Sequence, residues 1–402
     1  MQLSVIIVNY NVKHYVYQCL QSLRKAAHGL DWEVLVVDNN SSDGSVDYLR
    51  ECFPDGTFPQ LHIIANTDNP GFGKANNQAI SMAKGNYVLL ANPDTFVSEE
   101  TLRRCLDFME QHPDAGCLGV KMLNANGTFA PESRRGVPTP WASFCKITRL
   151  SKLFPHSKTF GYYYMQHLPI DQPAKVEIVS GAFMMLKREV VNQVGTFDED
   201  YFMYCEDTDL SYRMLKAGYH NYYLPTQILH YKGESTRRNT YSYVNNFYKA
   251  IFIFFKKHFN SHIFLLRILI YIAIYVLAAL SFIKGTWRKL SYKIKSSIAP
   301  TKTRLVCLVR EENIDLVNSL AAKYDLEVKM FNPTVVDATH LRNIVADSAP
   351  YYIVFDTSLY NYSEVLNLAH AYSALPHNGS SYVGTLYPER QMIITNLHIF
   401  TL

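Results

Sequence analysis

Short runs of β-branched and aliphatic residues alternate with segments of helical periodicity through the first part of the chain. The apolar runs fall at residues 3–8, 33–37, 61–65 and 87–91, and a helix-like segment follows each of them. Strands that alternate with helices of this length are typical of βαβ units. The sequence therefore predicts an α/β fold, Rossmann-like, with a mostly parallel sheet and helices on both of its faces.

The same alternation returns after residue 300, beyond an interruption that is both basic and apolar. At 402 residues the chain is longer than one ordinary domain. We therefore expect a first α/β domain at 1–242, membrane-associated helices with a basic linker at 243–300, and a small α/β domain at 301–402. The strand ends of the last domain carry neither a phosphate loop nor an acid/base pair. We expect it to serve docking, either with a second copy of the chain or with an assembly partner.

The middle segment combines positive charge with apolar length. Nine of the 39 Lys and Arg residues lie between residues 249 and 295, where there is no acid, so the rest of the chain holds 30 bases against 35 acids. The run 263–283 carries one charge, Arg267, and about 20 apolar residues suffice for a helix that crosses a bilayer. A buried core helix is the alternative. Trp287 and the lysines around the run favour the membrane.

Bases flank this apolar run on both sides, and Lys and Arg near a span favour the cytoplasmic side. A re-entrant or interfacial arrangement would keep both α/β domains in the cytoplasm, with the aromatic, basic helix 243–259 lying on anionic lipid. Nucleic acid is not an expected partner, because these bases flank an apolar run and do not interleave along a face.

The seven cysteines show no CxxC spacing, which favours a reducing compartment. The first apolar run is too short for a secretory signal. Together these features predict a location at the cytoplasmic face of the inner (cell) membrane.

Polar residues follow each of the first four predicted strands. They are Asn9, Tyr10 and Asn11 after the first, residues 38–45 after the second, residues 66–77 after the third, and Asn92, Pro93 and Asp94 after the fourth. Ligands bind outside the carboxyl ends of the strands in an open parallel sheet, so we expect these residues to converge. Turn chemistry accounts for any one group alone. The four groups together predict a ligand site.

Asp94 is an unusual residue to find directly after a strand that reads as core. A carboxylate beside a phosphate-binding site repels the ligand unless a divalent cation lies between them, and Mg²⁺ and Mn²⁺ prefer such oxygen ligands. Pro93 fixes φ and ends the strand. The residues thus predict a metal ligand at Asp94, with a helix cap near Ser98 as the alternative.

Six motifs in a fixed order resemble the inverting glycosyltransferases of family 2. They are VIIVNYN from Val5, VVDNNSSDGS from Val36, NPGFGKANNQAI from Asn69, NPDT from Asn92, the long segment 179–219 with SGAF and CEDTD, and ILHYKGEST from Ile228. The resemblance covers about residues 3–240 and is strongest to the rhamnosyltransferase-like branch that builds bacterial surface polysaccharides. It implies a GT-A fold, a nucleoside-diphosphate-sugar donor and a divalent cation, Mn²⁺ or Mg²⁺.

One feature departs from the family pattern, because the Asp-x-Asp motif appears here as Asn92-Pro93-Asp94. The resemblance implies that His230 supplies the missing metal ligand from across the site, and an imidazole suits Mn²⁺ better than Mg²⁺. Asp94 and His230 are therefore the expected metal ligands. A histidine with a purely structural role is the alternative for His230.

The nucleotide side can be argued from hydrogen-bond complementarity. A uracil or thymine ring offers an N–H donor that Asp38 can accept, and the ring of Tyr10 can stack on the base. Asp38 as a turn cap is the alternative. Gly71 and Gly73 permit close backbone approach before a helix whose N-terminal N–H groups face the site.

The resemblance implies a larger donor-binding set. Its members are Asn9, Tyr10, Asp38, Asn69, Gly71, Phe72, Gly73, Asn76, Asn77, Asn92 and Asp94, together with Arg237 and Arg238 from a loop expected to close over the diphosphate.

The catalytic base is expected in the CEDTD segment, because inversion is a single displacement in which one carboxylate takes the proton of the acceptor hydroxyl. Acids in a first helical turn are also favoured for structural reasons, and Asp209 is expected to pair with Arg213. The resemblance implies that Asp207 is the base, with Glu206 as the alternative. It also implies an acceptor-side wall formed by Ser180, Gly181 and Ala182.

These observations predict a membrane-attached, metal-dependent inverting glycosyltransferase. It would transfer a sugar, with rhamnose as one candidate, from a dTDP- or UDP-sugar to a lipid-linked saccharide. A processive synthase is less favoured because the chain lacks a Gln-x-x-Arg-Trp element. A non-catalytic scaffold that binds nucleotide-sugar in a polysaccharide assembly complex is the alternative from another class.

Overall fold

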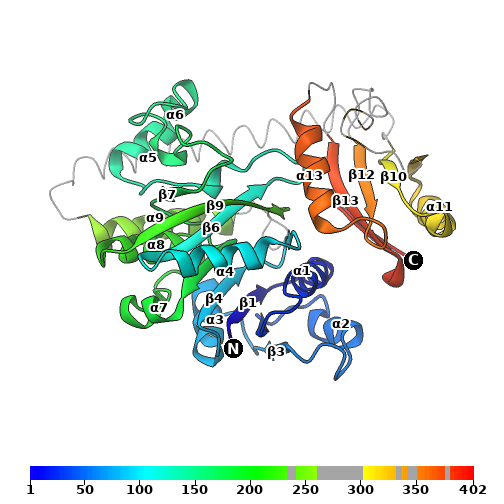
Figure 1. Cartoon of the computed structure of the whole chain (residues 1–402), viewed down its shortest axis with the longest axis horizontal. Helices are drawn as coiled ribbons and strands as arrows, with labels where there is room; N and C mark the ends of the chain where they lie inside the picture. Colours follow the sequence, from blue (N-terminus) through cyan, green and yellow to red (C-terminus); the bar gives the residue numbers. More distant parts are fainter. Residues whose placement is uncertain are drawn as a thin grey trace.

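The computed structural model describes residues 1–232, 241–259, 302–331, 351–375 and 381–402, together with Asp337, Thr339 and Leu341. The predicted apolar run 263–283, the linker 284–300 and the predicted donor residues Arg237 and Arg238 lie outside these residues. In the ranges just given, no helix is long and apolar enough to span a bilayer. Figure 1 shows the described elements arranged around two sheets.

The larger sheet lies in the first 230 residues and has nine strands. They are β1 (Leu3–Asn9), β2 (Trp32–Asp38), β3 (Leu61–Ala65), β4 (Tyr87–Ala91), β5 (Thr95–Val97), β6 (Ala115–Leu123), β7 (Ala174–Val176), β8 (Phe183–Lys187) and β9 (His220–His230). The helices of this part are α1 (Lys13–Ala26), α2 (Ser45–Cys52), α3 (Phe72–Met82), α4 (Thr101–Gln111), α5 (Pro140–Ile147), α6 (Leu150–Leu153), α7 (Arg188–Val194), α8 (Glu206–Lys216) and α9 (Tyr241–His258), with short 3₁₀ turns η1 (Pro131–Ser133) and η2 (Tyr162–Tyr164).

The strand order is β3-β2-β1-β4-β8-β6-β9-β5, with β7 beside β9. The predicted parallel arrangement holds for β3, β2, β1 and β4, but β8 joins β4 antiparallel, and β5 and β7 both join β9 antiparallel. The sheet is therefore mixed.

Both faces of the parallel half are covered, which explains its nearly continuous apolar strands. Along β1, Val5 and Ile7 belong to a core shared with α1, α2 and α4. The alternate residues Ile6 and Val8 belong to a second core shared with α3, α7 and α8. The period of two along an extended strand therefore places β1 at the centre of the domain.

A second, six-stranded sheet is formed by residues 304–401, in the order β11-β10-β12-β13-β14-β15. Its strands are β10 (Arg304–Leu308), β11 (Glu327–Phe331), β12 (Tyr351–Asp356), β13 (Ser381–Tyr387), β14 (Met392–Ile394) and β15 (Ile399–Thr401), and its described helices include α11 (Ile314–Tyr324), α13 (Tyr362–Ser373) and the 3₁₀ turns η4 (Glu311–Asn313) and η5 (Pro388–Arg390). The first four strands in this order are parallel, and the last two are antiparallel.

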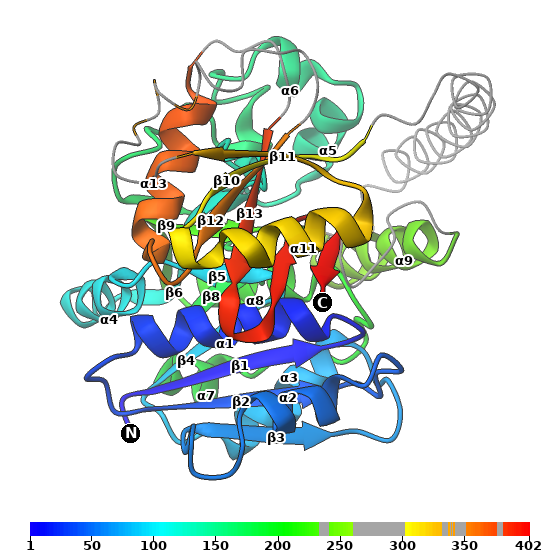
Figure 2. The ribbon, with the colours of Figure 1, turned by 90° about the vertical axis from the view of Figure 1, so that its right-hand side faces the viewer.

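The second sheet packs directly on the first domain, and Figure 2 shows α1 between the two sheets. The buried amide of Gln18 on α1 donates a 2.8 Å hydrogen bond to Thr385 Oγ1 on β13. The carboxylate of Glu99 accepts from the backbone N–H groups of Tyr362 and Ser363 at the start of α13, both at 2.9 Å, where the helix dipole favours an acid. One apolar core runs through both parts.

Candidate active site

The carboxyl ends of β1 and β2 meet side by side, because Asn9 pairs with Asp38 in the parallel register. The Asn9 amide donates to Asp38 Oδ1 at 2.7 Å, and the backbone N–H of Ser41 donates to Asp38 Oδ2 at 2.9 Å. Asp38 thus caps a turn, which was the alternative to a role in binding the base. Each carboxylate oxygen can still accept one further hydrogen bond, and the exposed ring of Tyr10 follows Asn9 directly.

The loop after β3 is held against the end of β2 by side-chain amides. Asn39 Nδ2 donates to Asn69 Oδ1 and to the Gly71 carbonyl, both at 3.3 Å, while Asn69 Oδ1 accepts from Gly71 N at 3.0 Å. Gly71 has φ +97°, and a Cβ there would lie 2.6 Å from the carbonyl oxygen of Phe202. Only glycine fits this position. Sequence reasoning did not single out Asn39, although it stands in the polar segment after β2.

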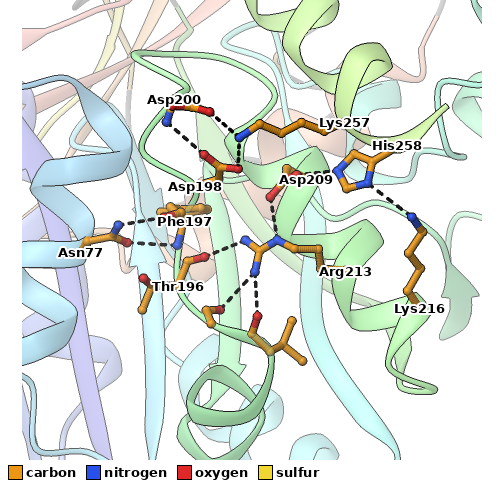
Figure 3. Close-up of polar contacts among 12 residues, drawn as sticks. Asn77, Thr196, Phe197, Asp198, Asp200, Asp209, Arg213, Lys216, Lys257 and His258 are labelled. Carbon is orange, nitrogen blue, oxygen red and sulfur yellow. Dashed lines mark hydrogen bonds and ion pairs between the residues drawn. The ribbon is translucent and has the colours of Figure 1, made fainter. Parts of the chain in front are cut away.

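Asn76 and Asn77 on α3, which were predicted to bind the sugar donor, form hydrogen bonds with backbone groups of the protein. Asn76 Nδ2 donates to the Phe72 carbonyl at 2.9 Å. Asn77 donates to the Phe197 carbonyl at 2.8 Å and accepts from its N–H at 3.0 Å, as Figure 3 shows. These bonds fix α3 against the segment that precedes α8. A contact of either amide with the donor stays a prediction, as do the roles of Phe72 and Gly73.

The segment after β4 brings Asn92, Asp94 and His230 together. Because β5 runs antiparallel to β9, Thr95 lies opposite His230. The imidazole Nε2 of His230 lies 3.2 Å from Asp94 Oδ1 and 3.4 Å from Asn92 Nδ2. Asp94 does not cap a helix, since β5 separates it from α4, which begins at Thr101.

The chemistry of this group suits a divalent cation. Burial alone would raise the pKa of the Asp94 carboxyl. The charge of His230 and backbone hydrogen bonds have a larger, opposite effect, so the pKa of Asp94 is below its ordinary value. His230 Nδ1 is buried without a hydrogen-bond partner in the described part of the chain. Those residues contain no set of three His, Cys, Asp or Glu side chains suited to a metal ion. Asp94 and His230 would therefore share a cation with phosphate oxygens and water, as Mg²⁺ sites commonly do.

The predicted base Asp207 lies in the first turn of α8 and is held by three donors. Its Oδ2 accepts from Arg135 Nη2 at 2.5 Å and from the backbone N–H of Gly181 at 2.9 Å. Its Oδ1 accepts from the Thr208 hydroxyl at 3.1 Å. Sequence reasoning missed Arg135, whose only signal is an Arg-Arg pair in the long connection from β6 to β7.

The neighbouring carboxyl of Glu206 has a different environment. It is 6% exposed, and Oε2 has no hydrogen-bond partner among the residues described. Burial, followed by the negative charge of Asp207, raises the pKa of Glu206 to about 8. Tyr204 and Cys205 before it have φ values of 72° and 63°, a left-handed conformation that costs of order 1–3 kcal/mol for such residues. Strained backbone of this kind is often found at functional sites.

The predicted acceptor-side residues 180–182 connect the two halves of the site. The carbonyl oxygen of Ala182 accepts from Asn92 N at 3.0 Å, and Gly181 N donates to Asp207 as described above. A Cβ at Gly181 would lie 3.2 Å from the Asp207 Cβ, so the backbone approaches Asp207 closely. The strand end that carries Asp94 and the helix that carries Asp207 therefore contact the same short segment.

Asp209 has the structural role that its spacing from Arg213 predicts (Figure 3). Arg213 Nε donates to its Oδ2 at 2.7 Å, and His258 Nε2 lies 2.6 Å from its Oδ1. Sequence reasoning missed His258, which ties the end of α9 to α8. Lys257 beside it forms ion pairs with Asp198 and Asp200.

Helix α9 was expected to lie on lipid, and the structure gives one of its faces a protein partner. Ala250 and Phe254 are buried against Val137, Ile178 and Tyr201. A lipid contact of the other face stays a prediction.

Comparison of the sequence with known proteins identifies the family of the first part of the chain. Residues 4–195 match the family model described as Glycosyl transferase family 2. The chain is 29% identical over 265 residues to an N-acetylglucosaminyl-diphospho-decaprenol L-rhamnosyltransferase of Mycobacterium tuberculosis, covering 63% of this chain and 83% of that protein. It is 32% identical over 135 residues to a poly(ribitol-phosphate) beta-glucosyltransferase of Bacillus spizizenii, covering 33% of this chain and 21% of that protein.

A similar solved structure is the mannosyltransferase PcManGT of Pyrobaculum calidifontis in complex with GDP-Man and Mn²⁺. It matches with 18% identity and a TM-score of 0.43, over 61% of this chain and 60% of that one. The family match spans the strand ends that carry Asp38, Asp94 and Gly181. Residues 4–195 of this chain therefore form a glycosyltransferase family 2 domain, which contains most strands of the mixed α/β sheet.

Proposed function

We propose that the chain is an inverting, metal-dependent glycosyltransferase that moves a sugar from a dTDP- or UDP-sugar to a lipid-linked saccharide. The observation that carries this proposal is the double contact of residues 180–182, which hydrogen-bond to Asn92 and to Asp207. A cation-binding end and a carboxylate base on either side of one short segment are what a single displacement requires. The name of the mycobacterial relative makes rhamnose and a diphospholipid-linked GlcNAc the first candidates.

On the donor side, Asp38 accepts the ring N–H of the base and Tyr10 stacks on it. The glycine-containing loop at Gly71 lets the backbone approach the diphosphate. Asn92 orients the sugar-phosphate end beside Asp94 and His230, which hold the cation. When bound, a divalent cation neutralises the charge that develops on the departing diphosphate.

On the acceptor side, Asp207 accepts the proton of the attacking hydroxyl. The new C–O bond forms at the anomeric carbon on the face opposite the nucleotide, while the bond from that carbon to the diphosphate oxygen breaks, so the configuration inverts. Arg135 and Gly181 N hold the Asp207 carboxylate in one orientation. Glu206 is the alternative base, because its pKa of about 8 lies near a working pH.

The acceptor lipid places the enzyme at a membrane, for which we propose the cytoplasmic face. Residues 243–300 are the proposed attachment, with anionic lipid as their partner. Residues 301–402 support α1, which follows the Asn9 strand end. Binding of a second copy or an assembly partner would use their other surfaces.

The direct test is transfer by the purified full chain from a panel of dTDP-, UDP- and GDP-sugars to a diphospholipid-linked GlcNAc, with Mn²⁺ present. We expect product with inverted anomeric configuration from one donor, and none from Asp94→Ala. Asp55→Ala, which removes an exposed loop acid, serves as the matched control. Donor binding without product from any acceptor would leave the non-catalytic scaffold as the better description.

A further inference from the structure

The connection between Arg135 and Asp171 carries an unusual concentration of exposed apolar side chains. In the described part of the chain, thirteen large apolar side chains are exposed, and four of them lie between residues 141 and 154. They are Trp141 at 48%, Phe144 at 39%, Leu153 at 71% and Phe154 at 52% exposure. Single exposed apolar residues are ordinary, but a cluster marks an interaction site.

The aromatic side chains of this set contact one another through Phe160, and Leu153 directly precedes Phe154. The ring of Trp141 lies 5.6 Å from that of Phe144 and 6.1 Å from that of Phe160, and Phe160 lies 5.4 Å from Phe154. Figure 1 shows α5 and α6 beyond β7, at the edge of the molecule and away from the second sheet. We call residues 141, 144, 153, 154 and 160 the aromatic surface.

The segment that carries the aromatic surface is also positively charged. Residues 136–170 contain four Lys and Arg residues and no Asp or Glu. Arg149, Lys152 and Lys158 are exposed, and none of them forms an ion pair with another described residue. Lys146 is used differently, since its ammonium lies 3.6 Å from the centre of the Tyr163 ring.

This combination identifies the occupant by its chemistry. Tryptophan and phenylalanine beside unpaired lysine and arginine suit the boundary between acyl chains and anionic headgroups. Lysine is depleted at protein–protein interfaces, which makes a protein partner a poorer match. The positively charged side chains of Arg149, Lys152 and Lys158 are complementary to a negatively charged lipid surface.

The aromatic surface lies on the same chain connection as the arginine that binds the candidate base. Arg135, which binds Asp207, belongs to the same β6–β7 connection, and Val137 N donates a 2.6 Å hydrogen bond to Glu177 just before the acceptor-side segment. Gly136 N donates to the Tyr163 carbonyl at 3.0 Å. A bilayer that holds the aromatic surface would thus contact the same connection that supplies the Arg135 partner of Asp207.

We propose that the aromatic surface and its three free bases dock on the anionic face of a lipid bilayer and so present the headgroup region to Asp207. The value of this docking for catalysis rests on the proposed lipid-linked acceptor. The lipid contact itself does not, because it follows from the exposed side chains and their charge.

Trp141 provides the test, since the chain has three tryptophans and the double variant Trp32→Phe/Trp287→Phe leaves only Trp141. The full-length variant would be mixed with phosphatidylcholine vesicles, with and without phosphatidylglycerol. We expect a blue shift of the Trp141 emission and quenching by spin-labelled lipid, both stronger with the anionic vesicles. Protein that floats with the vesicles while Trp141 stays unquenched would overturn the proposal, whatever other segments hold it there.

A charge variant tests the three bases separately. Arg149→Gln/Lys152→Gln/Lys158→Gln should reduce the quenching-detected affinity for anionic vesicles by roughly 100-fold. The matched control Lys84→Gln/Arg103→Gln/Arg104→Gln removes three exposed bases elsewhere and should leave that affinity unchanged. Equal losses in both variants would overturn the proposal. So would a Trp141 shift that depends on protein concentration without lipid, which would identify a second copy as the occupant.

Both measurements use neither donor nor acceptor. A chain that fails to transfer sugar can still show the lipid contact, and an active enzyme can fail to show it. The two proposals therefore stand or fall independently.

Discussion

Arg135 Nη2 lies 2.5 Å from Asp207 Oδ2, in an ion pair whose side chains are only 14% and 13% exposed. Removing one member of such a pair leaves the other charge buried and unpaired, which is costly. The pair also joins two distant parts of the chain, because Arg135 belongs to the connection that carries the aromatic surface. The orientation of the proposed base therefore depends on a residue 72 positions earlier.

Arg135→Gln tests whether this pair positions the base. The variant removes the charge and the forked donor while keeping a similar length, so Asp207 should lose its fixed orientation. We expect kcat to fall by about 100-fold, with the donor KM within a few-fold of wild type because the hydrogen bonds of the Arg135 side chain within the described residues go to Val179 and Asp207. Arg135→Lys should recover part of the loss, since it restores charge without the fork. Arg104→Gln on α4 is the control. A donor KM that rises as much as kcat falls would count against a positioning role.

Asp207→Asn and Glu206→Gln separate the two candidates for the base. An amide keeps the shape of the carboxylate but cannot take a proton, so loss of the base should cost about 10² to 10⁴ in kcat. We expect this loss in Asp207→Asn, with donor affinity retained. Glu206→Gln should remain within tenfold of wild type. If the larger loss belongs to Glu206→Gln, and if the wild-type rate rises through about pH 8, then Glu206 is the base.

The raised pKa of Glu206 also has a consequence for stability. Its pKa lies at about 8 in the folded chain against an ordinary 4.5, so the folded state binds this proton more tightly than the unfolded state does. The free energy of unfolding should therefore fall as the pH rises from about 4.5 to about 8, and level off above that. Glu206→Gln removes this contribution.

The expected difference can be bounded. Above about pH 8 the Gln variant should be the more stable of the two, by at most about 5 kcal/mol at 1.36 kcal/mol per pKa unit, while near pH 4 the two should be similar. Urea denaturation of both chains across this range measures the difference. If the free energies of unfolding of the two proteins change in parallel with pH, the Glu206 carboxyl ionises with an ordinary pKa.

Asp94→Ala should remove metal-dependent binding of the nucleoside diphosphate. A strand-end carboxylate contributes little packing, so the variant should fold normally. In the wild type, UDP or dTDP at 100 times its dissociation constant with Mn²⁺ should add about 2.7 kcal/mol to stability. This gain should vanish in Asp94→Ala and in excess chelator, and persist in Asp55→Ala. Wild-type turnover that continues in excess chelator would contradict the proposed role of Asp94.

The convergence of Asn9, Asp38 and Asn92 could be predicted from sequence because parallel strands align their carboxyl ends. The pairing of Asp94 with His230 could be predicted only through family resemblance, since it depends on β5 lying antiparallel to β9. Arg135 could not be predicted, because nothing in the sequence of a long connection states which strand end it returns to.

One feature of the sequence indicates that α1 is covered by another part of the protein. Gln18 lies on the apolar face of α1, where it is 1% exposed, and a buried amide needs a partner. Its partners are Thr385, 367 residues away at 2.8 Å, and the hydroxyl of Tyr231 at 3.3 Å. A polar residue in an apolar stripe predicts that a partner exists, but not its identity, because the docking of two preformed sheets depends on the shapes of both surfaces.

The contact between the two sheets can be tested at Gly127. Its φ is +76°, and a Cβ there would lie 2.1 Å from the carbonyl oxygen of Ala369 on α13. Gly56 is the matched control, because its φ is +81° and a Cβ there meets nothing within 4 Å. Alanine at either position costs about 1–2 kcal/mol of left-handed strain. Only Gly127→Ala should also separate α13 from the first domain.

We therefore expect Gly127→Ala to lower the free energy of unfolding more than Gly56→Ala does, and to speed hydrogen exchange in α13 and β13 while leaving β1 and β2 protected. Because α1 follows the strand end that carries Asn9, donor affinity should also weaken in Gly127→Ala alone. Equal stability, exchange and donor affinity in the two variants would mean that the second sheet rests on α1 without supporting it.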